Sequence, residues 1–201
     1  MQASQPEVRQ RFTIAHELTH WSLRNPQLAS RLAVTTRAAF RSEEIMCDTV
    51  AGALLMPRPW LRSMVIGHHS QAGSGGLETL REVAATARVS LATATVRFRD
   101  VFLWRRALLH WTRTSAGWCF DDEAGVMPWE QGLIAPWADV SPILSAAAAQ
   151  PGVVLDQDMP LRLGVVEESV RVQLLAGREA AFALARIHRS VGGVCPARNE
   201  E

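Results

Sequence analysis

The spacing of apolar residues predicts helices in the first half of the chain. Two stretches, about 7–24 and 42–56, carry apolar residues three to four positions apart, as amphipathic helices do. Pro57 and Pro59 follow the second stretch and are expected to end it, because proline lacks the amide hydrogen that a continuing helix needs. We therefore predict that residues 1–67 form a mainly helical module.

The next segments predict a connection and a pair of helices. Residues 68–76, HHSQAGSGG, are small and polar with three glycines, which is typical of a flexible linker. Residues 77–101 resume a helical pattern that divides at Ser90, a residue suited to be the N-cap of a second helix. We expect residues 77–103 to be a helix-turn-helix-like region.

From about residue 104 the pattern changes to alternating apolar and polar positions. The segments ESVRVQLL, 168–175, and REAAFALARI, 178–187, are typical of strands. Residues 104–201 are therefore expected to form an α/β domain, and the whole chain an α+β protein. This region also holds five tryptophans. They could line a ligand pocket, but indoles are more often part of a core, which is the reading we favour: Trp104, Trp111, Trp118, Trp129 and Trp137.

Composition narrows the class of protein. The 201 residues are 48% hydrophobic with a net charge of +1, which indicates a globular chain large enough to bury a core. Apolar runs are too short for a membrane span, the N-terminus has no signal-peptide core, and three scattered cysteines suit a reducing cytoplasm. All 21 cationic residues are arginine, so sites that depend on lysine are excluded.

The segment TIAHELTHWSL, residues 13–23, offers a candidate metal site. His16 and His20 are four residues apart, so on a helix their imidazoles share a face and can bind one ion. Glu17 lies one step around the helix, where it can reach a water on that ion and act as general base. The alternative is two partly buried histidines on an ordinary amphipathic helix.

A third ligand is expected from the helix over 42–56. Glu44 and Asp48 share a face, which permits Glu44 to bind the metal while Asp48 accepts the free N–H of a metal-bound histidine. Cys47 is the competing ligand, because thiolates bind zinc well, although its apolar neighbours suit a core thiol. Glu43 is expected to face solvent if Glu44 faces the ion.

This set of residues predicts metal-assisted amide hydrolysis. With three protein ligands, a metal keeps one position open for a water whose pKa it lowers, and Glu17 would take the proton from that water. Two imidazoles and a carboxylate suit Zn²⁺, with Mn²⁺ or Fe²⁺ as alternatives. The oxyanion donor would be His, Arg, Trp or a backbone N–H, because the chain has no Tyr. His68 and His69 are nearest in sequence, but we interpret them as loop-tip residues.

These motifs resemble a known family. RQRFTIAHELTHWSL followed by EIMCDTVAGALLMP, within residues 9–57, is similar to the ImmA/IrrE family of zinc metallopeptidases, in its radiation-response regulator branch. The resemblance implies a gluzincin-type, zincin-like core with His16, His20 and Glu44 as ligands, Glu17 as base and Asp48 as the partner of a ligand. It also implies cleavage of a helix-turn-helix transcriptional repressor, with a GAF-like sensor domain at the C-terminus.

The chain departs from the family pattern in one place. Family members carry some tens of residues of strand and helix before the RFTLAHE segment, whereas only ten residues precede Arg11, so we expect the N-terminal sheet region to be missing. Zincins bind substrate along an edge strand of that sheet.

The helix-turn-helix-like region is expected to be structural or to dock the repressor. Its second helix starts with Leu91, Ala92, Thr93 and Ala94, which offer few donors to base edges, so we do not expect direct DNA binding. His110, His188, Cys119 and Cys195 have no ligand-like spacing and are assigned no role.

The leading hypothesis is a cytoplasmic, zinc-dependent endopeptidase that cleaves a helix-turn-helix repressor and so derepresses stress-response or mobile-element genes. The alternative is a non-proteolytic DNA-binding or sensor regulator that retains a relic metal site. A third option, an interaction module without chemistry, leaves the complete ligand set unexplained.

Overall fold

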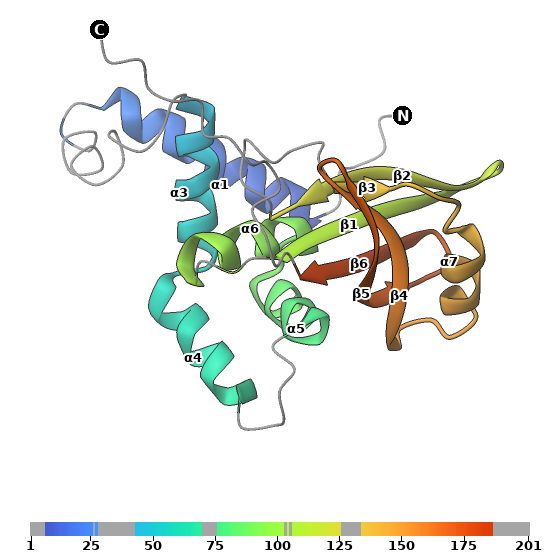
Figure 1. The fold of residues 1–201 in the computed structure, drawn as a ribbon. Coiled ribbons are helices and arrows are strands. Elements are labelled where there is room, and N and C mark those ends of the chain that lie inside the picture. The colour runs from blue at the N-terminus through green and yellow to red at the C-terminus, as the bar shows by residue number, and fades with distance from the viewer. Residues whose placement is uncertain are drawn as a thin grey trace, which may run out of the picture. The chain divides into compact units, whose positions relative to one another are not determined.

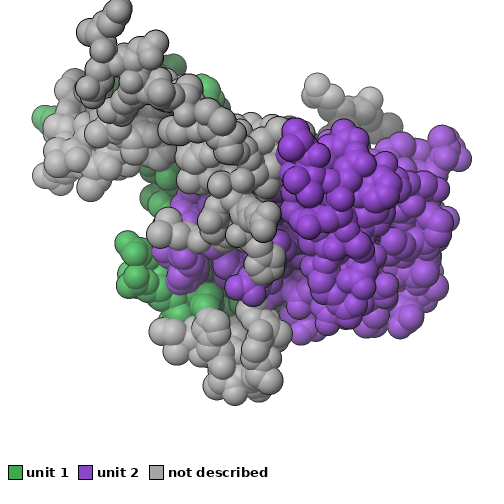
Figure 2. Space-filling view, in the orientation of Figure 1, with its two compact units in different colours: residues 1–75, 79–97 green, residues 76–78, 98–201 purple. Residues whose placement is uncertain are grey.

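The chain combines helices with one antiparallel sheet, so the mixed α and β content expected from the sequence is confirmed. The computed structural model describes residues 7–25, 27, 43–69, 76–102, 104, 106–125 and 134–186. The chain divides into two compact units, which Figure 2 colours separately: residues 1–75 with 79–97, and residues 76–78 with 98–201. None of the helices in the described ranges has the length and apolar character of a membrane span.

The first unit begins with the predicted helices. α1 spans Glu7–Arg24 and α3 spans Glu43–Leu55, which agrees with the apolar spacing of the sequence (Figure 1). A third helix, α4, spans Arg58–His69 and has Pro59 in its first turn, where the missing amide hydrogen costs no bond. The prediction that His68 and His69 lie in a loop is therefore wrong, because both belong to the end of α4. Their side chains lie outside the described residues, as do residues 70–75.

Two further helices, α5 over Leu77–Ala87 and α6 over Leu91–Phe102, occupy the region predicted to be helix-turn-helix-like. α5 ends at Arg88, which has a positive φ of 52°, and the Val89 amide then donates to the Ala84 carbonyl at 2.9 Å. This is a Schellman-type helix end. Ser90 caps α6 as predicted, since its Oγ accepts the Thr93 amide at 3.0 Å.

The second unit contains a six-stranded sheet in which all neighbouring strands are antiparallel, in the order β2-β1-β6-β5-β4-β3. The first and last strands of this sheet in sequence, β1 and β6, therefore pair in its middle, with Leu109 opposite Ala183. Both predicted strand segments are confirmed within β5 and β6. The strands are β1 Arg106–Thr114, β2 Gly117–Ala124, β3 Ile134–Pro136, β4 Val154–Leu163, β5 Val166–Ala176 and β6 Ala180–Arg186.

Alternation along the strands buries one face of this sheet. In β5 the buried positions are Val170, Val172, Leu174 and Ala176, and helix α7, Ser141–Ala148, contributes Leu144 and Ala147 to the same core.

The tryptophans divide between core and surface. Trp111 is 1% exposed in this core and Trp118 packs against it, as expected for core indoles. Trp104 is partly exposed, and its ring packs on that of Phe98 with 5.1 Å between centroids. Trp137 is 45% exposed, so its core assignment is wrong. Trp129 lies outside the described residues.

Candidate metal centre

The candidate site lies where α1 packs against α3. The buried residues of α1 are the small Ala15 and Thr19. Thr19 satisfies its buried hydroxyl by donating to the Ala15 carbonyl at 2.9 Å. The carboxylates of Glu43 and Glu44 lie in the first turn of α3, where the helix dipole favours negative charge.

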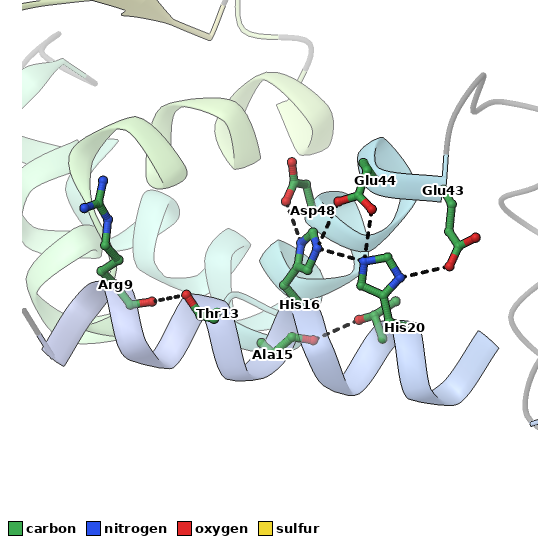
Figure 3. A network of polar contacts seen from close by, with 9 residues as sticks. Arg9, Thr13, Ala15, His16, His20, Glu43, Glu44 and Asp48 are labelled. Atoms are coloured by element: carbon green, nitrogen blue, oxygen red, sulfur yellow. Dashed lines mark hydrogen bonds and ion pairs between the residues drawn. The ribbon is translucent and has the colours of Figure 1, made fainter. Parts of the chain in front are cut away.

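His16 and His20 project from α1 toward α3, and Glu44 faces them from α3 (Figure 3). The two Nε2 atoms are 3.0 Å apart. One carboxylate oxygen of Glu44 lies 3.2 Å from Nε2 of His16, and the other lies 3.3 Å from Nε2 of His20. The sequence prediction that these three side chains converge on one point agrees with this geometry.

The other ring nitrogens are held by carboxylates. Nδ1 of His16 lies 2.8 Å from Oδ1 of Asp48, the predicted partner of a ligand histidine. Nδ1 of His20 lies 2.9 Å from Oε1 of Glu43. A carboxylate only accepts hydrogen bonds, so each Nδ1 carries the ring hydrogen, and neutral rings then have only lone pairs at Nε2.

The central point therefore collects acceptors without a donor. Two imidazole lone pairs and two carboxylate oxygens of Glu44 face one another, and the ring hydrogens of His16 and His20 are engaged elsewhere. With both rings neutral this arrangement is repulsive, and either a metal cation between the acceptors or a proton on His20, whose pKa is raised, relieves it. The groups that face this point are two imidazoles and one carboxylate. As metal ligands, they suit a divalent transition metal.

The separations also fit such an ion. Two ligand atoms bound to one tetrahedral zinc at about 2.0–2.1 Å lie about 3.3–3.4 Å from each other. The two Nε2 atoms are 3.0 Å apart, and each lies 3.2 or 3.3 Å from a different oxygen of Glu44. These residues could therefore hold a metal with little movement.

Glu43 makes a contact that sequence reasoning missed. As expected it is exposed to solvent, with 56% of its side chain accessible, but its carboxylate also contacts His20. The polar contacts run in opposite directions along the two helices, since His16 meets Asp48 and His20 meets the earlier Glu43. An antiparallel arrangement of α1 and α3 could have predicted this contact. If Asp48 binds His16, a residue about one turn earlier on α3 lies opposite His20.

The carboxylates around the site shift the pKa values of two neighbours. The hydrogen bond from Glu43 raises the pKa of His20 above its ordinary value of 6.5; burial opposes this, and the charges of Glu44, Glu43 and Glu17 support it. Burial first, and then the charges of the same acids and of Asp48, raises the pKa of Cys47 to about 11. Without a metal, Cys47 is therefore a neutral thiol.

Two donors compete for the third position. The ligand atoms of His16, His20 and Cys47 lie within 4.8 Å of one another, so Cys47 borders the site as well as Glu44. Glu44 is the better third ligand, because its oxygens lie at 3.2–3.3 Å from the ligand nitrogens, whereas Cys47 must first lose its proton. Glu17 is exposed on α1, next to His16 in the sequence.

The residues assigned no role lie away from this group. His110 and Cys119 are on the sheet, in β1 and β2, where Nδ1 of His110 lies 3.1 Å from a carboxylate oxygen of Asp121. His188 and Cys195 lie outside the described residues.

Comparisons with known proteins place the N-terminal half of the chain. Residues 1–99 match the family model Peptidase M78, described as the IrrE N-terminal-like domain. A solved structure described as a Mycobacterium tuberculosis transcriptional regulator is similar to the chain, with a TM-score of 0.43 and 14% sequence identity. That match covers 90% of this chain and 57% of the regulator, so the chain spans little more than half the regulator's length. No curated protein matches significantly. Residues 1–99 are therefore similar to the IrrE N-terminal-like domain that the Peptidase M78 model describes.

Proposed function

We propose that the protein is a zinc-dependent, site-specific endopeptidase that cleaves a helix-turn-helix transcriptional repressor in the cytoplasm and so derepresses stress-response or mobile-element genes. The observation that carries the proposal is the convergence of acceptors from His16, His20 and Glu44 on one point. The similarity of residues 1–99 to a peptidase family supports it. The repressor as substrate, the zincin-like character of the helical unit and the GAF-like character of residues 104–201 rest on the resemblance to ImmA/IrrE proteins.

His16, His20 and Glu44 would hold the metal, with Zn²⁺ as first choice and Mn²⁺ or Fe²⁺ as alternatives. When bound, the metal supplies the Lewis acidity that activates a water and polarises the scissile carbonyl. Glu17 would be the general base, which its place next to His16 on α1 and its exposure to solvent support. It accepts the proton of the attacking water and passes it to the leaving amine, which balances the hydrolysis.

Asp48 and Glu43 position the ligands. Each accepts the Nδ1 hydrogen of one imidazole, at 2.8 and 2.9 Å, and so keeps the Nε2 lone pair aimed at the metal. These carboxylates also increase the basicity of both rings, which strengthens their bonds to a cation.

The residues of helix α6 give little support to the DNA-binding alternative. Asp100 is its one exposed residue, and an acid repels phosphate. Arg97 donates from Nε to the Met56 carbonyl at 3.1 Å, where it satisfies a backbone acceptor just beyond the end of α3. Arg99 pairs with Asp100 at 2.8 Å. Both arginines of this helix thus have bonds within the chain, which favours a structural or repressor-docking role for α5 and α6.

The test is cleavage of a purified helix-turn-helix repressor by the full chain with Zn²⁺. We expect one cut, which a chelator prevents and which Glu17→Gln slows by about 10²-fold or more, because general-base catalysis contributes about 10²–10⁴-fold. Glu168→Gln, the same chemical change at an exposed position of strand β5, is the control and should cleave normally. An unchanged rate in Glu17→Gln refutes the mechanism. Tight metal binding without any cut, together with retardation of promoter DNA, supports the regulator instead.

A further inference from the structure

Cys47 is a buried thiol that borders the metal centre. Its side chain is 0% exposed, whereas Glu44, one turn earlier on α3, is 69% exposed. Its Sγ lies within 4.8 Å of the ligand nitrogens of both His16 and His20. Among the described residues it has no hydrogen-bond partner.

The position of Cys47 differs from that of an ordinary core thiol. A structural cysteine is surrounded by apolar groups, but this one borders two imidazole nitrogens that lack a donor. The other described cysteine, Cys119, is exposed on β2, so the described cysteines are not all buried.

We propose that Cys47 is the fourth protein ligand of the metal, so that the resting centre has the closed donor set His16, His20, Glu44 and Cys47. Glu44 is 69% exposed and Cys47 is 0% exposed, and both lie near the ligand nitrogens of His16 and His20. In tetrahedral zinc geometry a thiolate sulfur and an imidazole nitrogen lie about 3.6 Å apart, given bonds of about 2.3 and 2.0–2.1 Å. Separations of up to 4.8 Å would shorten by up to about 1.2 Å to complete the set.

Closing the centre has a consequence for the reaction. The thiol releases its proton to solvent as the sulfur–metal bond forms, and the four protein ligands leave no position for water. Catalytic zinc sites keep that position open, whereas closed four-ligand sites are structural. The centre is therefore latent at rest and becomes active when Cys47 leaves the metal. This inference rests on the proposed function, because it concerns the regulation of the same site.

Cobalt substitution of the full chain tests the ligand directly. Co²⁺ replaces Zn²⁺ in tetrahedral sites, and a thiolate bound to it gives a charge-transfer band in the near ultraviolet, while the visible bands report binding in tetrahedral geometry. We expect the charge-transfer band in the native protein and in Cys119→Ala, and its loss in Cys47→Ala with the visible bands retained. At saturating zinc, Cys47→Ala should cleave the repressor faster than the native protein.

The outcomes separate the two proposals. Stoichiometric cobalt binding without a sulfur band in the native protein overturns the role of Cys47 but leaves the metallopeptidase intact. A sulfur band that persists in Cys47→Ala and disappears in Cys119→Ala also overturns it, since a surface thiol then binds the ion. A rate at or below that of the native protein in Cys47→Ala refutes the closed resting state. No stoichiometric cobalt binding in any variant contradicts the proposed function itself.

Discussion

Replacing either carboxylate that holds a ligand imidazole should weaken metal binding by a similar amount. Glu43→Gln and Asp48→Asn remove the negative charge at 2.9 Å from Nδ1 of His20 and at 2.8 Å from Nδ1 of His16. Both substituted amides keep an oxygen that can accept the ring hydrogen, so the ring orientation is largely retained. What is lost is the charge that makes the imidazole a stronger ligand.

The size of the effect follows from distance and exposure. Loss of a group that orients a metal ligand costs about 10–100-fold in metal affinity, which is about 1.4–2.7 kcal/mol. Glu43 and Asp48 are 56% and 59% exposed, so water screens both charges to the same extent, while the imidazoles are 16% exposed. The screening and the retained amide oxygen place the expected loss at the lower end, about tenfold for each variant.

Competition between the protein and a chromophoric chelator for Zn²⁺ measures these affinities. Glu78→Gln on α5 carries the same change away from the centre and should bind zinc as the native protein does. If Glu43→Gln binds zinc within twofold of the native protein while Asp48→Asn does not, Glu43 is a solvated surface residue. The claim that Glu43 and Asp48 each hold one ligand imidazole would then be refuted.

Three other predictions concern the ligands, the apo protein and the core. Glu44→Gln should abolish stoichiometric zinc binding measured by elemental analysis, whereas Glu17→Gln should retain it; equal loss in both would contradict their different roles. Because hydrogen bonding to Glu43 raises the pKa of His20 above 6.5, the metal-free protein should gain stability below pH 6.5 and lose it as pH rises through the raised pKa. Glu43→Gln should reduce that dependence in denaturation with chelator present, and an identical pH profile would refute the shift. Trp111→Ala should lower the free energy of unfolding by about 3–5 kcal/mol in guanidinium titrations, since Trp111 is 1% exposed in the sheet core; a loss below about 1 kcal/mol would be inconsistent with that burial.

The helices of the metal centre could be predicted because their signals are local. Residues four apart share a helix face whatever surrounds them, so His16 with His20, and Glu44 with Asp48, were expected to face in common directions. Acceptance of a histidine hydrogen by Asp48 followed from the same spacing. The strands within residues 104–201 could be predicted for the same reason, because alternation with a period of two is visible directly in the sequence.

Errors arose where the outcome depends on tertiary contacts. The role of Glu43 depends on the antiparallel sense of α1 and α3, which helix periodicity does not contain. His68 and His69 form the end of α4, although the glycines that follow them suggested a loop. The last residue of a helix is difficult to predict, because helix ends vary by one or two residues. Trp137 is exposed and Trp111 buried, although composition treats the two indoles alike. The order β2-β1-β6-β5-β4-β3 pairs segments about 70 residues apart, which local patterns do not specify.

Anomalous X-ray scattering at the zinc absorption edge, from crystals of the zinc-loaded protein, tests the metal centre most directly. The predicted result is one strong peak between α1 and α3, about 2.0–2.2 Å from Nε2 of His16, Nε2 of His20 and a carboxylate oxygen of Glu44. A peak bound elsewhere, or the absence of a peak between these helices at full zinc loading, would contradict the account.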